Sequence, residues 1–161
     1  MIITSRLCRP TYSKLDGVGG LYRAGRWHEQ GNRVVYVSAS EALAALEVLV
    51  HLSSVTQFPE YVCVKAAIPE DLVFDIGNDL PRDWKTTRSA EAQALGTRWL
   101  HERRSAVLRV PSAVIPRESN YLINPEHADF RKISVQAPLP FEFDLRLLGG
   151  PASTVDDADA T

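Results

Sequence analysis

The spacing of apolar residues along the chain predicts a set of strands interrupted by two helices. Continuous or alternating apolar runs of strand length cover residues 2–9, 33–37, 61–68 and 72–76. Helical spacing covers residues 39–52 and 90–103, and strand-like spacing returns over 106–110, 111–115, 132–135 and 141–147. Because hairpin-like strands are mixed with only two helices, the pattern favours a single α+β domain over a doubly wound parallel sheet.

The first predicted helix contains an isolated acid. Ser38 and Glu41 match the S-x-x-E capping box, so Ser38 is predicted to cap a helix over residues 39–52. Glu47 is the one charged residue of the apolar stretch 42–50. A carboxylate in such surroundings loses hydration and needs a partner in the fold. Glu47 is therefore either a structural acid, bonded to a backbone amide or an arginine, or a group kept for chemistry.

The strand before this helix brings an aromatic residue into the same region. A period of two places Val34, Tyr36 and Ser38 on one face of the strand. Because the strand leads directly into the helix, we expect Tyr36 to lie near Glu47. Further along, Pro111 indicates a strand edge or a bulge, and residues 120–127 are predicted to form a loop with an Asn-Pro turn.

Composition narrows the class of protein. The chain has 161 residues, of which 45% are hydrophobic and 24% charged, as in an ordinary globular domain. A net charge of −2 gives no general attraction for nucleic acid. Cys8 and Cys63 are too few for a disulfide framework and wrongly spaced for zinc, and the four histidines share no ligand spacing, so we expect no metal site.

The ends of the sequence suggest where the domain stops. Residues 1–10 lack the long apolar segment of a secretory signal, and the apolar run around Glu47 is too short to span a membrane. We therefore expect a cytoplasmic protein without a membrane partner. From residue 149 the chain is small and acidic, which predicts a domain over 1–148 and an acidic tail over 149–161.

Several segments together resemble the RES-domain toxins, in the family's order and spacing. They are residues 25–27 (GRW), 34–38 (VVYVS), 44–48 (AALEV), 110–114 (VPSAV), 120–127 (NYLINPEH) and 143–147 (FDLRL). The resemblance implies a fold related to ADP-ribosyltransferases of the diphtheria-toxin type. It also implies the toxin of a type II toxin–antitoxin pair, neutralised by an Xre-type antitoxin. Ala24 and His28 depart from the residues common at their positions, and His28 could alter ligand contacts.

The resemblance also implies which residues form the site. Its name-giving Arg, Glu and Ser correspond to Arg26, Glu47 and Ser112, with Tyr36 as the aromatic partner. We expect the catalytic residues to be Glu47, Arg26 and Tyr36, and the substrate-binding residues to be Ser112, Trp27 and Asn120. Taken alone, each has a plainer interpretation: a surface salt bridge for the arginine, core packing for the two aromatic residues, and turn chemistry for the serine and the asparagine.

The implied activity is cleavage of the nicotinamide–ribose bond of NAD. NAD would be the substrate, with no resident cofactor, and the acceptor of ADP-ribose would be water, phosphate or a target protein. A carboxylate beside the ribose would stabilise the cationic transition state, as in glycoside cleavage. The alternatives are a ribonuclease toxin, which the slightly acidic charge disfavours, and a non-catalytic binding module. A homodimer and a toxin–antitoxin heterocomplex both fit this hypothesis.

Overall fold

A computed structural model of the protein describes residues 1–52 and 59–148. Its strands are β1 (Ile2–Cys8), β2 (Val35–Ser38), β3 (Tyr61–Ile68), β4 (Val73–Asp75), β5 (Val107–Pro111), β6 (Ser119–Ile123), β7 (Ser134–Val135) and β8 (Leu139–Phe141). Its α-helices are α1 (Gly19–Tyr22), α2 (Glu41–Leu49) and α3 (Ala90–Glu102). Short 3-10 helices occupy Pro10–Tyr12, Glu70–Leu72, Gly77–Asp79, Ala128–Lys132 and Leu145–Leu148.

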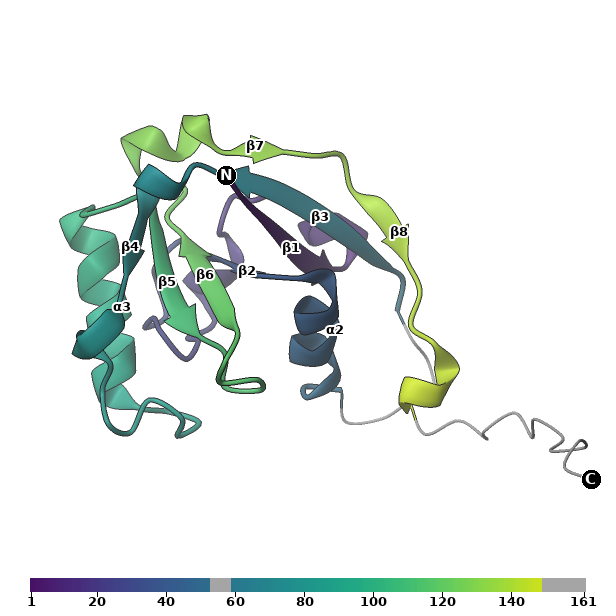
Figure 1. Ribbon diagram of the computed structural model, residues 1–161, viewed down its shortest axis with the longest axis horizontal. Coiled ribbons are helices and arrows are strands. Elements are labelled where there is room, and N and C mark those ends of the chain that lie inside the picture. The colour runs from purple at the N-terminus through teal and green to yellow at the C-terminus, as the bar shows by residue number, and fades with distance from the viewer. Residues whose placement is uncertain (53–58, 149–161) are drawn as a thin grey trace, which may run out of the picture.

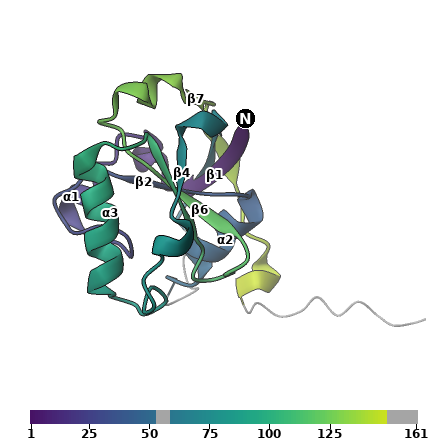
Figure 2. The ribbon, with the colours of Figure 1, turned by 60° about the vertical axis from the view of Figure 1, so that its left-hand side comes forward.

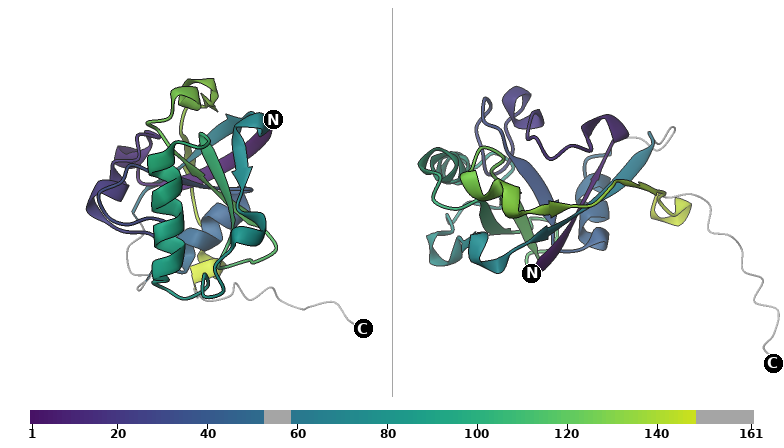
Figure 3. Two further views of the ribbon diagram at one scale, coloured as in Figure 1. Left: turned by 90° about the vertical axis from the view of Figure 1, so that its left-hand side faces the viewer. Right: turned by 90° about the horizontal axis from the view of Figure 1, so that it is seen from above.

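The strands form one sheet in the order β4-β5-β6-β2-β1-β3-β7, with β8 also paired to β3. The β4–β5 pair is parallel, and the other pairs are antiparallel. Figure 1 shows β5 and β6 between α3 and α2, and Figures 1 and 3 show β7 and β8 running along the edge of β3. The predicted α+β domain is therefore confirmed.

The two helices pack on the same face of the sheet but cover different halves of it. Apolar residues of α3 pack in a cluster with Trp27, Leu108 and Leu122, whereas those of α2 pack in a separate cluster with Leu7 and Cys63. The opposite face carries the largest apolar cluster, which includes alternate residues of the same strands. Figure 2 shows α3 and α2 on either side of β6, so the strip of sheet between the two helical cores runs along β2, β6 and the end of β5.

The predictions for β1, β3 and α3 are confirmed almost to the residue, but the start of α2 differs. Ser40 is the N-cap, and its hydroxyl accepts a hydrogen bond from the Leu43 amide at 3.1 Å. Ser38 remains in β2, where it pairs with Ser5 and Asn120. The capping-box prediction for Ser38 was wrong because sheet pairing keeps the chain extended two residues longer.

The predicted loop over 120–127 was also wrong, since β6 occupies its first half. Tyr121, Leu122 and Ile123 are buried in the interior of the sheet, between β2 and β5. The polar residues on both sides of this short run concealed it. The turn itself lies further on, where the Asn124 side chain accepts a hydrogen bond from the Glu126 amide at 3.0 Å.

Three further strand predictions needed correction. Of the predicted strand 141–147, only Phe141 lies in a strand, because the Asp144 carboxylate accepts hydrogen bonds from the backbone and side chain of Arg146 and supports a 3-10 turn. The strand 132–135 is reduced to β7, and residues beyond Pro111 turn away from the sheet. Strand β5 lies inside the sheet, but β4 pairs with it only as far as Arg109. On the β4 side, Pro111 therefore faces no partner strand, and its missing N–H costs no hydrogen bond. The predicted tail over 149–161 lies outside the described residues.

Candidate active site

Glu47 lies at the centre of a hydrogen-bonded group of polar side chains. Its Oε1 accepts hydrogen bonds from the Ser112 hydroxyl at 2.7 Å and from the Asn120 amide at 2.6 Å. The carbonyl oxygen of the Asn120 side chain accepts in turn from the Ser38 hydroxyl at 2.8 Å. The second carboxylate oxygen, Oε2, makes no hydrogen bond within residues 1–52 and 59–148. One oxygen is thus held, and the other is left for a ligand.

Helix α2 presents this acid at the edge of its apolar face. Leu43, one turn before Glu47, is buried, and Ala44 and Ala45 pack in the core that α2 forms with β1 and β3. Glu47 itself is half-buried, so its carboxylate keeps part of its exposure to solvent. The expected structural alternative is also absent, since its partners are a serine and an asparagine side chain, with no backbone amide or arginine among the described residues.

Ser112 is fully buried and holds the end of β5 to Glu47. While its hydroxyl donates to Glu47, its oxygen accepts from the Val114 amide at 3.1 Å and the Ile115 amide at 3.0 Å. One hydroxyl thus closes a turn, as the plainer interpretation had it, and also orients the acid, while a contact of Ser112 with substrate stays a prediction. With its lone pairs engaged by two amides, Ser112 is suited to positioning rather than to nucleophilic attack.

Arg26 lies at the corner of a tight turn closed by a bridge between Gly25 and His28. Its Nη1 donates to the carbonyl oxygens of Trp84 at 2.9 Å and Thr86 at 2.7 Å. Among the described residues Arg26 forms no salt bridge, unlike the surface salt bridge that was its plainer interpretation. The other guanidinium nitrogens, Nε and Nη2, make no hydrogen bond among residues 1–52 and 59–148. Arg26 therefore keeps donors for an anionic ligand.

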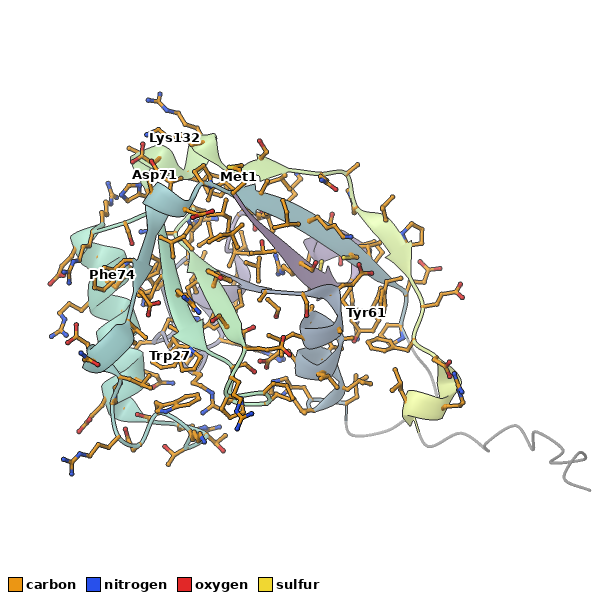
Figure 4. The ribbon with its side chains drawn as sticks, viewed as in Figure 1. Met1, Trp27, Tyr61, Asp71, Phe74 and Lys132 are labelled. Atoms are coloured by element: carbon orange, nitrogen blue, oxygen red, sulfur yellow. The ribbon has the colours of Figure 1, made fainter. Side chains whose placement is uncertain are left out.

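Trp27, the next residue of the turn, is a core residue. It is 2% exposed and stacks on Trp84, with ring centroids 6.1 Å apart. Figure 4 shows Trp27 on the α3 side of the molecule and Tyr61 on the α2 side. Packing is the role that these contacts support, and a contact between Trp27 and substrate stays a prediction.

The Tyr36 hydroxyl joins β2 to the Arg26 turn. It accepts a hydrogen bond from the Trp27 amide at 3.2 Å and lies 2.8 Å from Nδ1 of His28, whose Nε2 lies 3.0 Å from the Arg23 carbonyl oxygen. Because a carbonyl only accepts, Nε2 carries the proton and Nδ1 accepts from the Tyr36 hydroxyl. Burial raises the pKa of Tyr36, against the opposing effects of the Trp27 amide and the Arg26 charge, so Tyr36 stays a neutral phenol.

Strand β2 connects the two groups of site residues. Tyr36 contacts the Arg26 turn, and Ser38 contacts Asn120. The two residues lie on one face of β2, two positions and so about 7 Å apart along the strand. No hydrogen bond or ion pair joins Arg26 to Glu47 within the described ranges. The cation and the acid therefore remain available to a ligand lying along this face of the sheet.

The structure adds two residues that sequence analysis did not assign to the site. Ser38 orients the Asn120 amide, and His28 orients the Tyr36 hydroxyl. The period of two had placed Ser38 on the same face as Tyr36, but the capping-box pattern outweighed that signal. Sequence analysis noted only that His28 could alter ligand contacts; its side chain is 4% exposed and faces Tyr36.

Other features of the described residues lie outside this group. They contain no cluster of three His, Cys, Asp or Glu side chains able to hold a metal ion, and no helix with the length and apolarity needed to span a membrane. Cys8 and Cys63 are buried free thiols, and burial raises the pKa of each. A shallow cavity between α3 and the strands β4 and β5 is lined by none of the six predicted site residues.

Comparisons with known proteins identify the family of this chain. The RES domain family matches residues 4–144. The chain is 37% identical to "Toxin Res" of Photorhabdus laumondii over 152 residues, covering 91% of this chain and 97% of that protein. It is 34% identical to "Prs ADP-ribosylating toxin" of a Sphingobium species over 140 residues, covering 83% of this chain and 86% of that protein.

A solved structure shares the fold. The toxin–antitoxin complex MbcT–MbcA of M. tuberculosis contains a chain that superposes with a TM-score of 0.70 at 13% identity, covering 86% of this chain and 83% of that one. At this identity the match concerns the fold alone. The family match extends from β1 to the residues that follow β8, and the two relatives are each more than 30% identical to this chain over most of their length. This protein therefore belongs to the RES domain family.

Proposed function

We propose that this protein is the toxin of a type II toxin–antitoxin system and that it cleaves the nicotinamide–ribose bond of NAD. One observation carries the proposal: Glu47 has one carboxylate oxygen held by Ser112 and Asn120 and the other without a partner in the described residues. Arg26, on the same face of the sheet, keeps unused donors. Relatives named as toxins, one of them an ADP-ribosylating toxin, support the same function.

The chemistry needs a fixed negative charge beside the ribose. When the carbon–nitrogen bond breaks, nicotinamide leaves with the electron pair and the ribose carbon becomes cationic. Oε2 of Glu47 stabilises that charge, an effect typically worth about 3–4 kcal/mol for one preorganised group. An acceptor oxygen or nitrogen then bonds to the carbon and gives up its proton. Ser112 and Asn120 hold the carboxylate in place, so their contribution passes through Glu47.

The Arg26 turn supplies the second half of the site. The free N–H groups of Arg26 bind the pyrophosphate or a ribose hydroxyl, for which a planar and permanently charged fork is suited. The ring of Tyr36 stacks on nicotinamide. Its hydroxyl takes no part in proton transfer, because it is engaged by Trp27 and His28 and its pKa is raised. Substrate contacts of Trp27, Ser112 and Asn120 belong to the same proposal.

The proposal extends to partners and compartment. In this proposal NAD is the substrate, no resident cofactor is required, and the protein acts in the cytoplasm, where NAD is present. An antitoxin of the Xre type neutralises the enzyme by covering the face that holds Arg26 and Glu47. The relative named as an ADP-ribosylating toxin favours a protein acceptor as an alternative to water or phosphate. A homodimer and a heterocomplex with the antitoxin are both compatible with this proposal.

Product analysis tests the activity. Purified protein is incubated with NAD, with and without phosphate, and the products are identified by mass spectrometry. Release of nicotinamide is the expected result, and ADP-ribose or its 1-phosphate identifies water or phosphate as the acceptor. Labelled NAD in a cell lysate gives a labelled protein band if the acceptor is a protein. No nicotinamide under any of these conditions, together with degradation of added RNA, would replace this proposal with the ribonuclease alternative.

A further inference from the structure

We propose that His28 is a positioning residue for Arg26, and that it acts through the hydroxyl of Tyr36. Its kinetic consequence rests on the proposed function, whereas its structural consequence does not. His28 is 4% exposed, so its ring is not available to a ligand. Both ring nitrogens are engaged, Nε2 by the Arg23 carbonyl and Nδ1 by the Tyr36 hydroxyl. A buried histidine with both nitrogens bonded has one defined tautomer and one defined orientation.

The ring contacts the turn that carries Arg26. The Gly25 amide donates to the His28 carbonyl oxygen at 3.0 Å, which closes the turn with Arg26 and Trp27 at its corners. A Cβ on Gly25 would lie 2.7 Å from the His28 ring and equally close to the Tyr36 hydroxyl oxygen. Only glycine allows this approach, so the turn lies directly against the hydrogen bond between the two side chains.

The Tyr36 hydroxyl holds the middle of the turn while α3 holds its two ends. From α3, the Gln93 amide donates to the Gly25 carbonyl oxygen at 2.8 Å, and the Thr97 hydroxyl accepts from the Glu29 amide at 2.9 Å. Between these points, the Trp27 amide donates to the Tyr36 hydroxyl. Loss of the His28 acceptor therefore removes the group that orients the Tyr36 hydroxyl toward the Trp27 amide, next to Arg26, and leaves both anchors on α3 in place.

Protonation of His28 would disturb this arrangement. An added proton on Nδ1 makes it a donor, so the hydroxyl of Tyr36 faces two donors and its own proton loses its acceptor. Burial lowers the pKa of His28, and the Arg23 carbonyl opposes that shift. The neighbours of the His28 ring include the uncharged Gly20 from α1 and the Tyr36 hydroxyl from β2. Within the turn itself, the charged side chain is that of Arg26. The neutral ring, and the position of Arg26, should therefore persist until the medium is distinctly acidic.

Two substitutions test the role of the acceptor. His28→Leu removes it, whereas in His28→Asn the side-chain oxygen can take the place of Nδ1. We expect His28→Leu to raise the KM for NAD about tenfold, with a smaller change in kcat, as a lost Arg26 contact would do. His28→Asn should restore most of the affinity and should lack the loss of activity at acidic pH that we expect of the wild type. The exposed His101→Leu is the matched control and should leave KM unchanged.

The kinetic result has clear contrary outcomes. A wild-type KM in His28→Leu, or an acidic loss of activity that is the same in His28→Asn and the wild type, would overturn the proposal. Failure of the proposed function would look different, because the wild type itself would release no nicotinamide.

A measurement that needs no NAD tests the structural part, even if a variant proves unstable. Nitrogen NMR of the wild-type imidazole should show a proton on Nε2 and none on Nδ1 at neutral pH. The Arg26 guanidinium signals should be protected from exchange in the wild type and in His28→Asn, and lose protection in His28→Leu. The opposite tautomer, or equal protection in both variants, would contradict the role assigned to His28.

Discussion

The two oxygens of the Glu47 carboxylate have different surroundings. Oε1 accepts from two neutral donors, Ser112 and Asn120, which fix the side chain without neutralising its charge. Oε2 has no partner within the described ranges. A salt bridge would have fixed the acid equally well but would have cancelled the field that it exerts on a cationic ribose. The choice of partners is therefore part of the proposed mechanism.

Glu47→Gln should separate charge from structure. The glutamine oxygen can still accept from Ser112 and Asn120, so the melting temperature should stay within about 2 °C of the wild type. Without the negative charge, nicotinamide release should fall about 100-fold or more. Glu41→Gln in the same helix, which removes only an ion pair with Lys65, is the control and should keep full activity. Wild-type turnover in Glu47→Gln would remove this acid from the mechanism.

Ser112→Ala should impair both stability and activity, unlike the Glu47 variant. The substitution leaves the amides of Val114 and Ile115 without their acceptor and takes one donor from Glu47. Unsatisfied buried donors cost about 1–3 kcal/mol, which urea unfolding can measure. Ser134→Ala on the exposed strand β7 should change neither property. Unchanged stability in Ser112→Ala would show that the turn does not depend on this hydroxyl.

At the scale of elements, the position of the site follows from how α2 and α3 divide one face of the sheet. Each helix buries its own apolar core, and the polar side chains Ser38, Ser112 and Asn120 lie on the strip between those cores. Glu47 from α2 and the Arg26 turn, held by α3, then reach the strip from opposite sides.

The contact between α3 and the Arg26 turn depends on a glycine. A Cβ on Gly96 would overlap the carbonyl oxygen of Trp27. Helix propensity alone favours Gly→Ala by about 1 kcal/mol, but here the clash should reverse the sign and lower the melting temperature. Gly19→Ala in α1, where a Cβ would meet nothing within 4 Å, is the matched control. Stabilisation of Gly96→Ala, measured by thermal unfolding, would show that the helix and the turn move apart easily.

For the whole molecule, the buried histidine makes stability depend on pH. The pKa of His28 is lowered from its ordinary value of 6.5, so the unfolded chain binds the proton more readily than the folded one. The stability that comes from keeping His28 neutral is fully present above pH 6.5, and it is lost as the pH falls through the lower pKa that His28 has in the folded state. The melting temperature should therefore decline below about pH 6.5, and the decline should be smaller in His28→Asn.

A second pH effect lies in a separate range. The side chain and backbone of Arg146 lower the pKa of Asp144 from 3.8 to about 2, so any stability from that exposed pair is lost only between those values. Melting curves recorded between about pH 5 and pH 7 therefore report on His28 alone of these two groups. An unchanged melting temperature across that interval would argue against a buried neutral histidine.

Local patterns were sufficient where a segment is long and strongly periodic. The eight residues of β3 and the thirteen of α3 were predicted correctly because their own apolar spacing determines which face is buried. The short strand β6 was missed because three apolar residues between polar neighbours carry too little signal. Its strand conformation depends on pairing with β2, which is distant in sequence, as well as with its neighbour β5.

The sequence by itself supplied the candidate site residues, through motifs shared with one family. It did not determine their partners. Glu47 meets Ser112 across 65 positions and Asn120 across 73, and Arg26 meets Trp84 across 58. Such contacts depend on strand order and helix packing, and no local spacing encodes them. Apolar periodicity indicates only which side of an element is buried, whereas the assembled sheet determines which polar side chains meet on it and which carboxylate oxygen they bind.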